Sequence, residues 1–170
     1  MNKVLVMDTS ILCVWLGIPG KDTLGEGKDQ WDYHRVNQKI EQEVAANSLL
    51  VLPLASIIET GNYIAQCHGD NFSLATSLAE LIRETANSET PWAAFTVQSD
   101  LWSSEKLNEL ADKWPTLAAS KLSLGDATIK DVVEYYAEQR LSVEIFTGDE
   151  GLKAYEPISV PHIMRPRRRK

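Results

Sequence analysis

Three short runs of mostly apolar residues constrain the fold of this chain more than any other feature. They are Val4–Met7, Leu49–Leu52 and Val143–Phe146. A strand-length apolar run is typical of a strand that is buried on both faces. Residues 91–97, with the sequence PWAAFTV, are a further strand candidate. Because helical segments separate these runs, we predict a three-layer α/β domain whose mainly parallel sheet has four or five strands flanked by helices.

The segments between the runs have the features of helices. In residues 31–47, Val36, Ile40 and Val44 recur at a spacing of four, as on one face of a helix. The stretch Gly17–Gln30 contains several glycines and a proline, so we expect a loop there, long enough to act as a lid. We expect helices over residues 31–47, 54–67, 73–87, 99–114 and 124–140.

The composition is that of an ordinary globular chain, with 44% hydrophobic and 24% charged residues among 170. This length predicts one domain, which we place at residues 1–160, followed by a basic tail at residues 161–170. Cys13 and Cys67 lie in apolar stretches and are expected to be reduced structural thiols. Asp8 interrupts the apolar N-terminus, and no apolar run is long enough to span a membrane, so we expect a cytoplasmic protein.

Charge is distributed unevenly along the chain. The net charge is −7, but the last six residues, RPRRRK, contain five of the 17 basic residues and no acidic residue. Residues 1–164 therefore carry 12 basic and 24 acidic residues, a net charge of −12. Passive nucleic-acid binding usually uses a basic face, which such a body does not suggest. The tail is either a solvated end or an arm that contacts phosphates or an acidic partner through Arg165, Arg167, Arg168, Arg169 and Lys170.

Two acidic residues directly follow predicted strands. Asp8 ends the first apolar run, and Asp149 comes just after the last one. The carboxyl ends of parallel strands meet at one edge of a sheet, which is where functional groups gather. An Asp after a strand is also a common helix N-cap, so both interpretations stay open for each residue.

Asp126 and Glu59 lie in predicted helices, and the patterns around them differ. At about 100° per residue, Asp126 falls within about 20° of Val133 and Ala137, on the core-facing side of its helix. A carboxylate that faces inward needs a partner, although the first turn of a helix also favours an anion. Glu59 lies roughly 140° from Leu54, so periodicity alone places it in solvent.

Four sequence blocks, taken in order, resemble the motifs of the PIN domain. They are VLVMDTSIL, LPLASIIETGNYI, LSLGDATIKDVVEYY and IFTGDEGL, and the match extends over residues 1–155. Each motif is short, but the ordered set places one acid in each expected block. PIN domains are metal-dependent ribonucleases, and small single-domain members are typically VapC-like toxins of toxin–antitoxin pairs.

The resemblance implies an endoribonuclease whose catalytic and metal-binding residues are the acids of the four blocks, Asp8, Glu59, Asp126 and Asp149. Thr147 matches the family's hydroxyl residue before the last acid, and Thr9 or Ser10 matches the small polar residue after the first. Four carboxylates in one crevice repel each other without a cation, and one or two Mg²⁺ or Mn²⁺ ions prefer such oxygen ligands. The implied partners are RNA, an antitoxin protein and a second copy of the chain, but no membrane.

Other classes of protein that place an Asp after a first strand fit the sequence less well. Haloacid-dehalogenase phosphatases need a second Asp two residues later, where this chain has Ser10. A response-regulator receiver needs a second acid paired with the first, and none is evident. Nucleotide-binding folds need a glycine-rich phosphate-binding motif after a strand, and this sequence has none. The remaining alternative is a catalytically silent PIN scaffold that binds RNA or protein.

Removing the basic tail tests its role. We expect a protein truncated to residues 1–164 to bind RNA more weakly at low salt and with a flatter salt dependence. The reason is that each phosphate contact adds about 0.7–0.9 to the slope of log affinity against log salt. The metal requirement and pH profile of cleavage should not change. Filter-binding titrations of both proteins over a salt series measure this, and superimposable curves would leave the tail as ordinary solvated chain.

Overall fold

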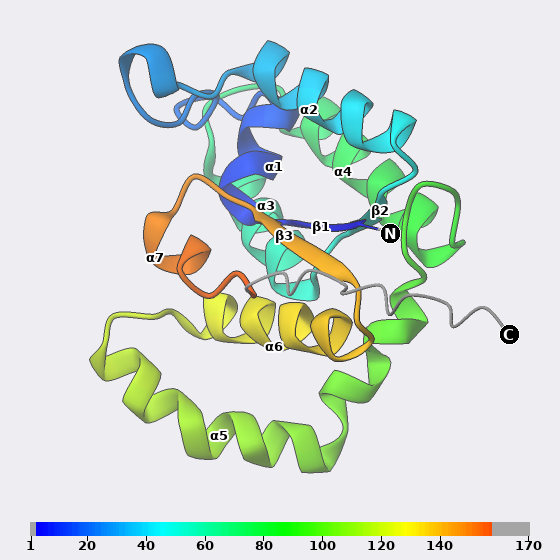
Figure 1. Ribbon diagram of the computed structural model, residues 1–170. Coiled ribbons are helices and arrows are strands. Elements are labelled where there is room, and N and C mark those ends of the chain that lie inside the picture. Colours follow the sequence, from blue (N-terminus) through cyan, green and yellow to red (C-terminus); the bar gives the residue numbers. More distant parts are fainter. Residues whose placement is uncertain (1–2, 158–170) are drawn as a thin grey trace, which may run out of the picture.

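The three apolar runs form the strands of one parallel sheet. The computed structural model describes residues 3–157, so the predicted tail at residues 161–170 lies outside the described residues. The strands follow the order β2-β1-β3 (Figure 1), with bounds β1 (Lys3–Met7), β2 (Leu49–Val51) and β3 (Ser142–Phe146). The predicted α/β class and the parallel arrangement of its strands are confirmed.

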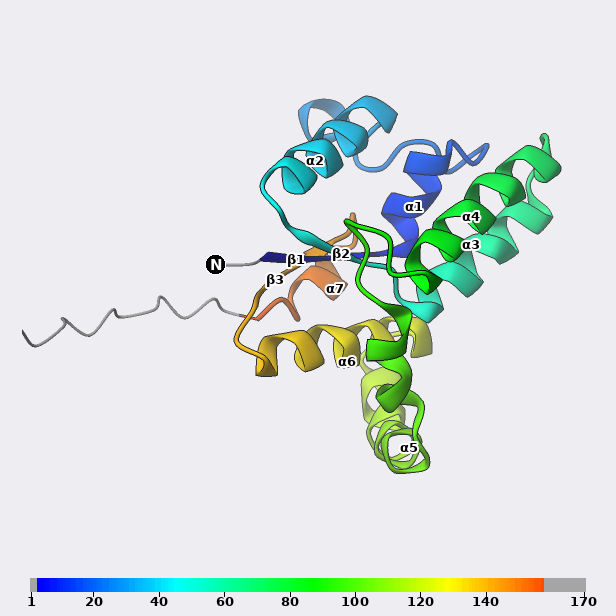
Figure 2. The same cartoon turned by 90° about the vertical axis from the view of Figure 1, so that its right-hand side faces the viewer.

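Helices cover both faces of the sheet, with α1 (Thr9–Leu16) and α2 (Tyr33–Ala45) on one face and α6 (Leu124–Glu138) on the other (Figure 2). Successive side chains of β1 point to opposite faces. Val4 and Val6 pack in the cluster that contains α6, while Leu5 and Met7 pack in the cluster that contains α1 and α2. All four side chains are fully buried, which explains why the sequence of this strand is a continuous apolar run.

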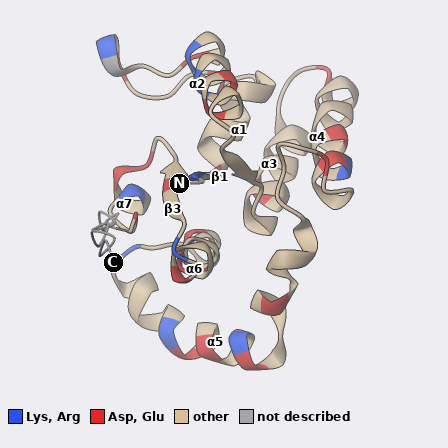
Figure 3. Ribbon diagram, turned by 45° about the vertical axis from the view of Figure 1, so that its right-hand side comes forward, with Lys and Arg blue, Asp and Glu red and all other residues tan. Residues whose placement is uncertain are grey.

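Further helices extend this core on two sides, with bounds α3 (Leu54–Gln66), α4 (Asn71–Ala86), α5 (Ser104–Ala119) and α7 (Glu150–Lys153). Helix α3 packs against α1, α4 and α6, whereas α5 packs on α6 as the layer farthest from the sheet (Figure 2). Acidic and basic segments alternate along α5 (Figure 3). Among residues 3–157, no helix combines the length and the apolar character that crossing a membrane requires.

Within residues 3–157 the sheet has three strands, fewer than the four or five that the sequence predicted. Residues 91–97 pair with β2 at a single position only. Pro91 has no N–H to extend the pairing, and the chain then enters a 3-10 helix, η2 (Phe95–Trp102). The buried side-chain amide of Gln98 donates to the carbonyl of Leu52 at 3.2 Å, so a side chain satisfies the backbone where a longer fourth strand would have paired.

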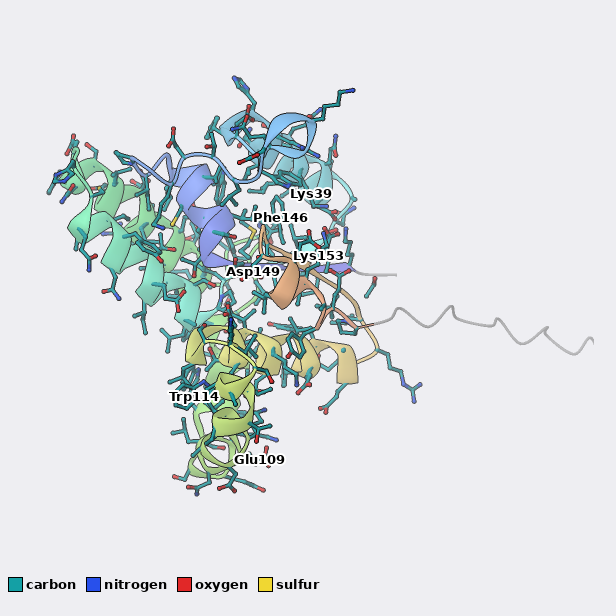
Figure 4. All side chains as sticks on the ribbon, turned by 90° about the vertical axis from the view of Figure 1, so that its left-hand side faces the viewer. Lys39, Glu109, Trp114, Phe146, Asp149 and Lys153 are labelled. Carbon is teal, nitrogen blue, oxygen red and sulfur yellow. The ribbon has the colours of Figure 1, made fainter. Side chains whose placement is uncertain are left out.

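Glu144 interrupts the apolar pattern of β3, and two ion pairs account for it. Its carboxylate lies 2.5 Å from Lys3 Nζ and 2.8 Å from Lys39 Nζ. Burial alone would raise the pKa of Glu144, but hydrogen bonds from the two lysines outweigh it and lower the pKa. Lys39 also lies near Phe146 (Figure 4), with Nζ 5.5 Å from the ring centroid. The charge is tolerated on a core strand because it is paired.

Candidate active site

A polar cleft of about 600 Å³ lies beyond the carboxyl ends of β1 and β3. The four acids of the predicted cluster all line it, although they come from four separate segments. Asp8 follows β1, Glu59 lies on α3, Asp126 lies in the first turn of α6, and Asp149 precedes α7. Figure 4 shows Asp149 between α1 and α6. Folding therefore brings these carboxyl groups to one crevice.

The buried carboxylate of Asp8 is held through one oxygen. Oδ2 accepts hydrogen bonds from Ser10 Oγ at 2.6 Å, from Thr147 Oγ1 at 2.8 Å and from the Ser10 backbone N–H at 3.3 Å. The bond from the backbone N–H makes Asp8 the N-cap of α1, so the N-cap interpretation is confirmed. Capping does not conflict with a position in the cleft, because it uses Oδ2 alone.

Thr147 connects Asp8 to Asp149. Its hydroxyl, which is buried, donates to Asp8 Oδ2 and accepts from the backbone N–H of Asp149 at 2.9 Å. Asp149 is in turn the N-cap of α7, since its Oδ1 accepts from the N–H groups of Gly151 at 2.7 Å and Leu152 at 3.2 Å. One hydroxyl therefore fixes the relative positions of the acids that follow β1 and β3.

Glu59 lines the cleft, although its helical periodicity placed it in solvent. Its Oε2 accepts a hydrogen bond from Thr9 Oγ1 at 2.9 Å. Its Oε1 lies so near Gly125 that a Cβ added there would come within 2.2 Å of this oxygen. A glycine at position 125 therefore allows the first turn of α6 to approach Glu59 closely.

The error for Glu59 arises because the buried face of α3 is largely polar. Ser56, Thr60 and Ile64 are its buried residues, whereas Ile58 is 54% exposed. Ser56 Oγ donates to the carbonyl of Met7 at 2.9 Å, which satisfies the backbone at the end of β1. Periodicity identifies a buried face by its apolar residues, so it misplaces a helix that packs through small polar ones.

Asp126 follows the N-cap of α6, which is Ser123. Ser123 Oγ donates to Asp126 Oδ2 at 2.7 Å and accepts from the backbone N–H of Asp126 at 3.0 Å. Burial raises the pKa of Asp126 against the effect of the Ser123 bond, and the charges of Asp8 and Asp149 raise it further. The negative charges of the cleft therefore act on one another, as expected for carboxylates that line one crevice.

The four carboxylates share one pattern of hydrogen bonding. Within residues 3–157, each accepts hydrogen bonds through only one of its two oxygens, and none is paired with a lysine, arginine or histidine. The donors fix the orientation of each carboxylate. The second oxygen of each one has no hydrogen-bond partner in this part of the chain, so it is free to accept a proton or to contact a cation.

The donor set suits Mg²⁺ or Mn²⁺ in its chemistry, because these hard ions prefer carboxylate and hydroxyl oxygens. Across the described residues, however, no group of three or more Asp, Glu, His or Cys side chains is arranged so that it could hold a metal ion. The carboxylates line a common cleft without converging on one point. The ion itself stays a prediction.

The loop between α1 and α2 forms a wall of the cleft that sequence patterns did not identify. Lys21 and Leu24 line the cleft from this loop. Leu24 and Trp31 are joined by two backbone hydrogen bonds of 2.9 and 2.7 Å. The side chain of Leu24 packs against Gly148, where an added Cβ would lie 2.8 Å from it. The length of the loop indicates an elaboration, but it does not show which side chains turn inward.

Helix α3 contributes three more polar or aromatic residues to the cleft, namely Asn62, Tyr63 and Gln66. They lie three, four and seven positions after Glu59, which places them on the same helical face. Because the resemblance to the PIN domain had already assigned Glu59 to the site, this spacing was the sequence signal that could have identified them.

Cys13 also lines the cleft, and its thiol is protonated at neutral pH. Burial, together with the negative charge of Asp8 and against the positive charge of Lys21, raises the pKa of Cys13 to about 11. A protonated thiol is a poor nucleophile. Cys13 and Cys67 are both free thiols, in agreement with the sequence prediction.

Comparisons of the chain with family models, with curated proteins and with solved structures found no match. The resemblance to the PIN domain therefore rests on the four sequence blocks and stays a prediction. The catalytic and metal-binding roles of the four acids stay predictions as well.

Replacing Thr147 with Val should lower the free energy of unfolding by about 1–2 kcal/mol. The isosteric side chain leaves the N–H of Asp149 without its acceptor and removes a donor from the buried Asp8 carboxylate. Thr147→Ser keeps the hydroxyl and should retain most of the stability. Urea unfolding of the three proteins measures these differences, and equal stability of the Val variant and the unchanged protein would contradict the connecting role of Thr147.

Replacing Asp126 with Asn should raise the free energy of unfolding in chelator at pH 7 by about 0.5–1 kcal/mol, because one repelling charge is removed. The raised pKa of Asp126 means that ionisation disfavours the folded state above that pKa and has no effect well below the unfolded value of about 3.9. The gain should therefore disappear as the pH falls below about 4. Thermal melts at a series of pH values test this.

The control for this experiment is Asp112→Asn, which changes an exposed acid on α5 that does not line the cleft. It should show no comparable gain at pH 7. A clear loss of stability for Asp126→Asn at pH 7 would instead mean that its carboxylate stabilises the start of α6, as a capping group does at about 1 kcal/mol.

Proposed function

We propose that this protein is a metal-dependent endoribonuclease that cleaves RNA phosphodiester bonds with its acidic cleft. The observation that carries the proposal is the shared pattern of the four carboxylates. Each has one oxygen fixed by hydroxyl or N–H donors and a second oxygen without a hydrogen-bond partner among residues 3–157. Acids that only cap helices or pair with lysines would not need to gather in one polar cleft.

In this proposal the cation is held by Asp8, Glu59, Asp126 and Asp149. When bound, it supplies a Lewis acid that activates water and stabilises the leaving oxygen of the phosphodiester. With a cation bound, the negative charge of the four carboxylates would be offset and a phosphate would be able to enter the cleft. The acidic body of the protein is therefore compatible with an RNA substrate.

The remaining roles belong to the chain's own groups. Ser10 and Thr147 orient Asp8, and Thr9 orients Glu59. Ser123 orients Asp126 through Oδ2, so Oδ1 is the oxygen of Asp126 that would contact the cation. The protonated Cys13 takes no part as a nucleophile.

The biological setting that we propose is the toxin component of a toxin–antitoxin pair, acting in the cytoplasm. This part rests on the resemblance of the four sequence blocks to VapC-like toxins. A short reading frame next to the gene, whose product binds this protein and suppresses cleavage, would support it. Induced expression in a bacterial host should then arrest growth, and co-expression of the neighbouring product should restore it.

A second candidate is a catalytically silent scaffold that binds RNA or protein. Within the described residues, the absence of three acids arranged to hold one ion favours this candidate. It predicts RNA or protein binding that is unaffected by chelator, and no cleavage in the presence of Mg²⁺ or Mn²⁺.

A cleavage assay separates the two candidates. The purified protein should cut a mixed-sequence RNA in Mg²⁺ or Mn²⁺ and not in chelator. Loss of a group that holds or orients a metal ion typically costs about 10–100-fold in activity, so Asp8→Asn and Asp126→Asn should each slow cleavage by at least about 10-fold. Asp112→Asn is the matched control and should cleave normally. Cleavage that persists in chelator, or that survives both cleft substitutions, would contradict the proposal.

A further inference from the structure

A second hollow of about 390 Å³ adjoins the acidic cleft. The two share four lining residues, Gly20 and Lys21 of the loop after α1 and Tyr63 and Gln66 of α3. Ile18 and Pro19 form an apolar side of this hollow. His68, which follows the end of α3, also lines it. An extended ligand that enters the cleft can therefore continue into the hollow without leaving the protein surface.

Lys21 and Tyr63 stand at the junction of the two spaces. Lys21 Nζ lies 3.9 Å from the centroid of the Tyr63 ring. Lys21 is also the basic residue among those that line the acidic cleft. Basic segments elsewhere are scattered among acidic ones on α2, α4 and α5 (Figure 3). A positive charge is thus placed beside four carboxylates, at the entrance to a space with an aromatic wall.

We propose that this hollow is the binding subsite for the nucleotide next to the phosphodiester bond that is cleaved. In this subsite Lys21 contacts the phosphate of that nucleotide, and its base stacks on Tyr63. The inference rests on the proposed function, because it identifies which part of the RNA chain lies beside the acidic cleft.

The chemistry of the lining fits a single nucleotide. A hollow of several hundred Å³ is the size of a small-molecule site. Aromatic rings bind bases of single-stranded RNA by stacking, and amide or imidazole groups can hydrogen-bond to base edges, as Gln66 and His68 can here. A lysine ammonium binds phosphate as a point charge. The hollow provides each of these groups on one continuous surface.

The contact between Lys21 and Tyr63 also allows an exchange when a nucleotide binds. Both residues are exposed, so their cation–π contact is weak in water. A phosphate offers Lys21 a full negative charge in place of the ring, and a base then takes the ring face that the ammonium leaves. The weak unliganded contact can therefore be exchanged for a bound nucleotide at little cost.

Titration with single nucleotides in chelator tests the subsite without requiring cleavage. Adenosine and uridine 5′-monophosphate, ribose 5-phosphate and inorganic phosphate are each added to the isotope-labelled protein, and the NMR signals of Tyr63, Gln66 and His68 are followed. The nucleotides should bind about 5-fold or more tightly than ribose 5-phosphate, since base stacking contributes at least this much. Tyr63→Ala should reduce the ratio to about 1, and Tyr63→Phe should preserve it.

Lys21→Ala should lower the affinities for the nucleotides and for ribose 5-phosphate by the same factor. Lys28→Ala, at an exposed position of the same loop, should change neither affinity. Equal affinity for nucleotide and ribose 5-phosphate, signals that move only outside the hollow, or an absence of binding would each overturn the subsite. RNA cleavage by a protein that fails this titration would leave the nuclease proposal standing. Nucleotide binding without metal-dependent cleavage would contradict the nuclease proposal and would still support nucleotide binding in the hollow.

Discussion

The hydrogen bond from Thr147 to Asp8 is the contact on which the arrangement of the cleft depends. Asp8 ends the central strand, and Thr147 follows an outer strand, so one bond of 2.8 Å sets the two strand ends against each other. The same hydroxyl accepts from the N–H of Asp149 and thereby places the start of α7. Ser10 completes the set by donating to the same oxygen of Asp8. A buried carboxylate is thus stabilised by donors from both ends of the chain.

The positions of the other two acids follow from the helices that pack beside these strand ends. Glu59 is drawn to the start of α1 by the hydroxyl of Thr9, and Gly125 leaves the space in which α6 meets it. Asp126 then enters the cleft in the first turn of α6, where burial and, to a smaller extent, the charges of Asp8 and Asp149 raise its pKa. Hydroxyl groups donate to one oxygen of each of these two acids, and within residues 3–157 no lysine offsets their charge and the second oxygen of each has no hydrogen-bond partner.

The sequence predicts the parts of this structure that depend on apolar burial. The strands and the inward side of α6 are apolar on the faces that they bury, so their patterns identify them correctly. Glu59 is misplaced because α3 packs through Ser56 and Thr60, whose small polar side chains hide the buried face from periodicity. The prediction of a fourth strand at residues 91–97 is wrong for a related reason. The side chain of Gln98 replaces the backbone pairing that an apolar run suggests. Position in the cleft, for Lys21 as for Glu59, depends on contacts between distant segments.

In the proposed function, acids from four segments act together on one cation. Binding of Mn²⁺, followed by the loss of its free-ion paramagnetic resonance signal, tests this directly with the intact protein. We expect saturable binding that is weakened at least about 10-fold by each of Asp8→Asn, Glu59→Gln, Asp126→Asn and Asp149→Asn, as when a group that holds or orients a metal is lost. Asp112→Asn should bind as the unchanged protein does. Binding that is equal in all of these variants, or no saturable binding at all, would show that the four acids do not hold a common cation.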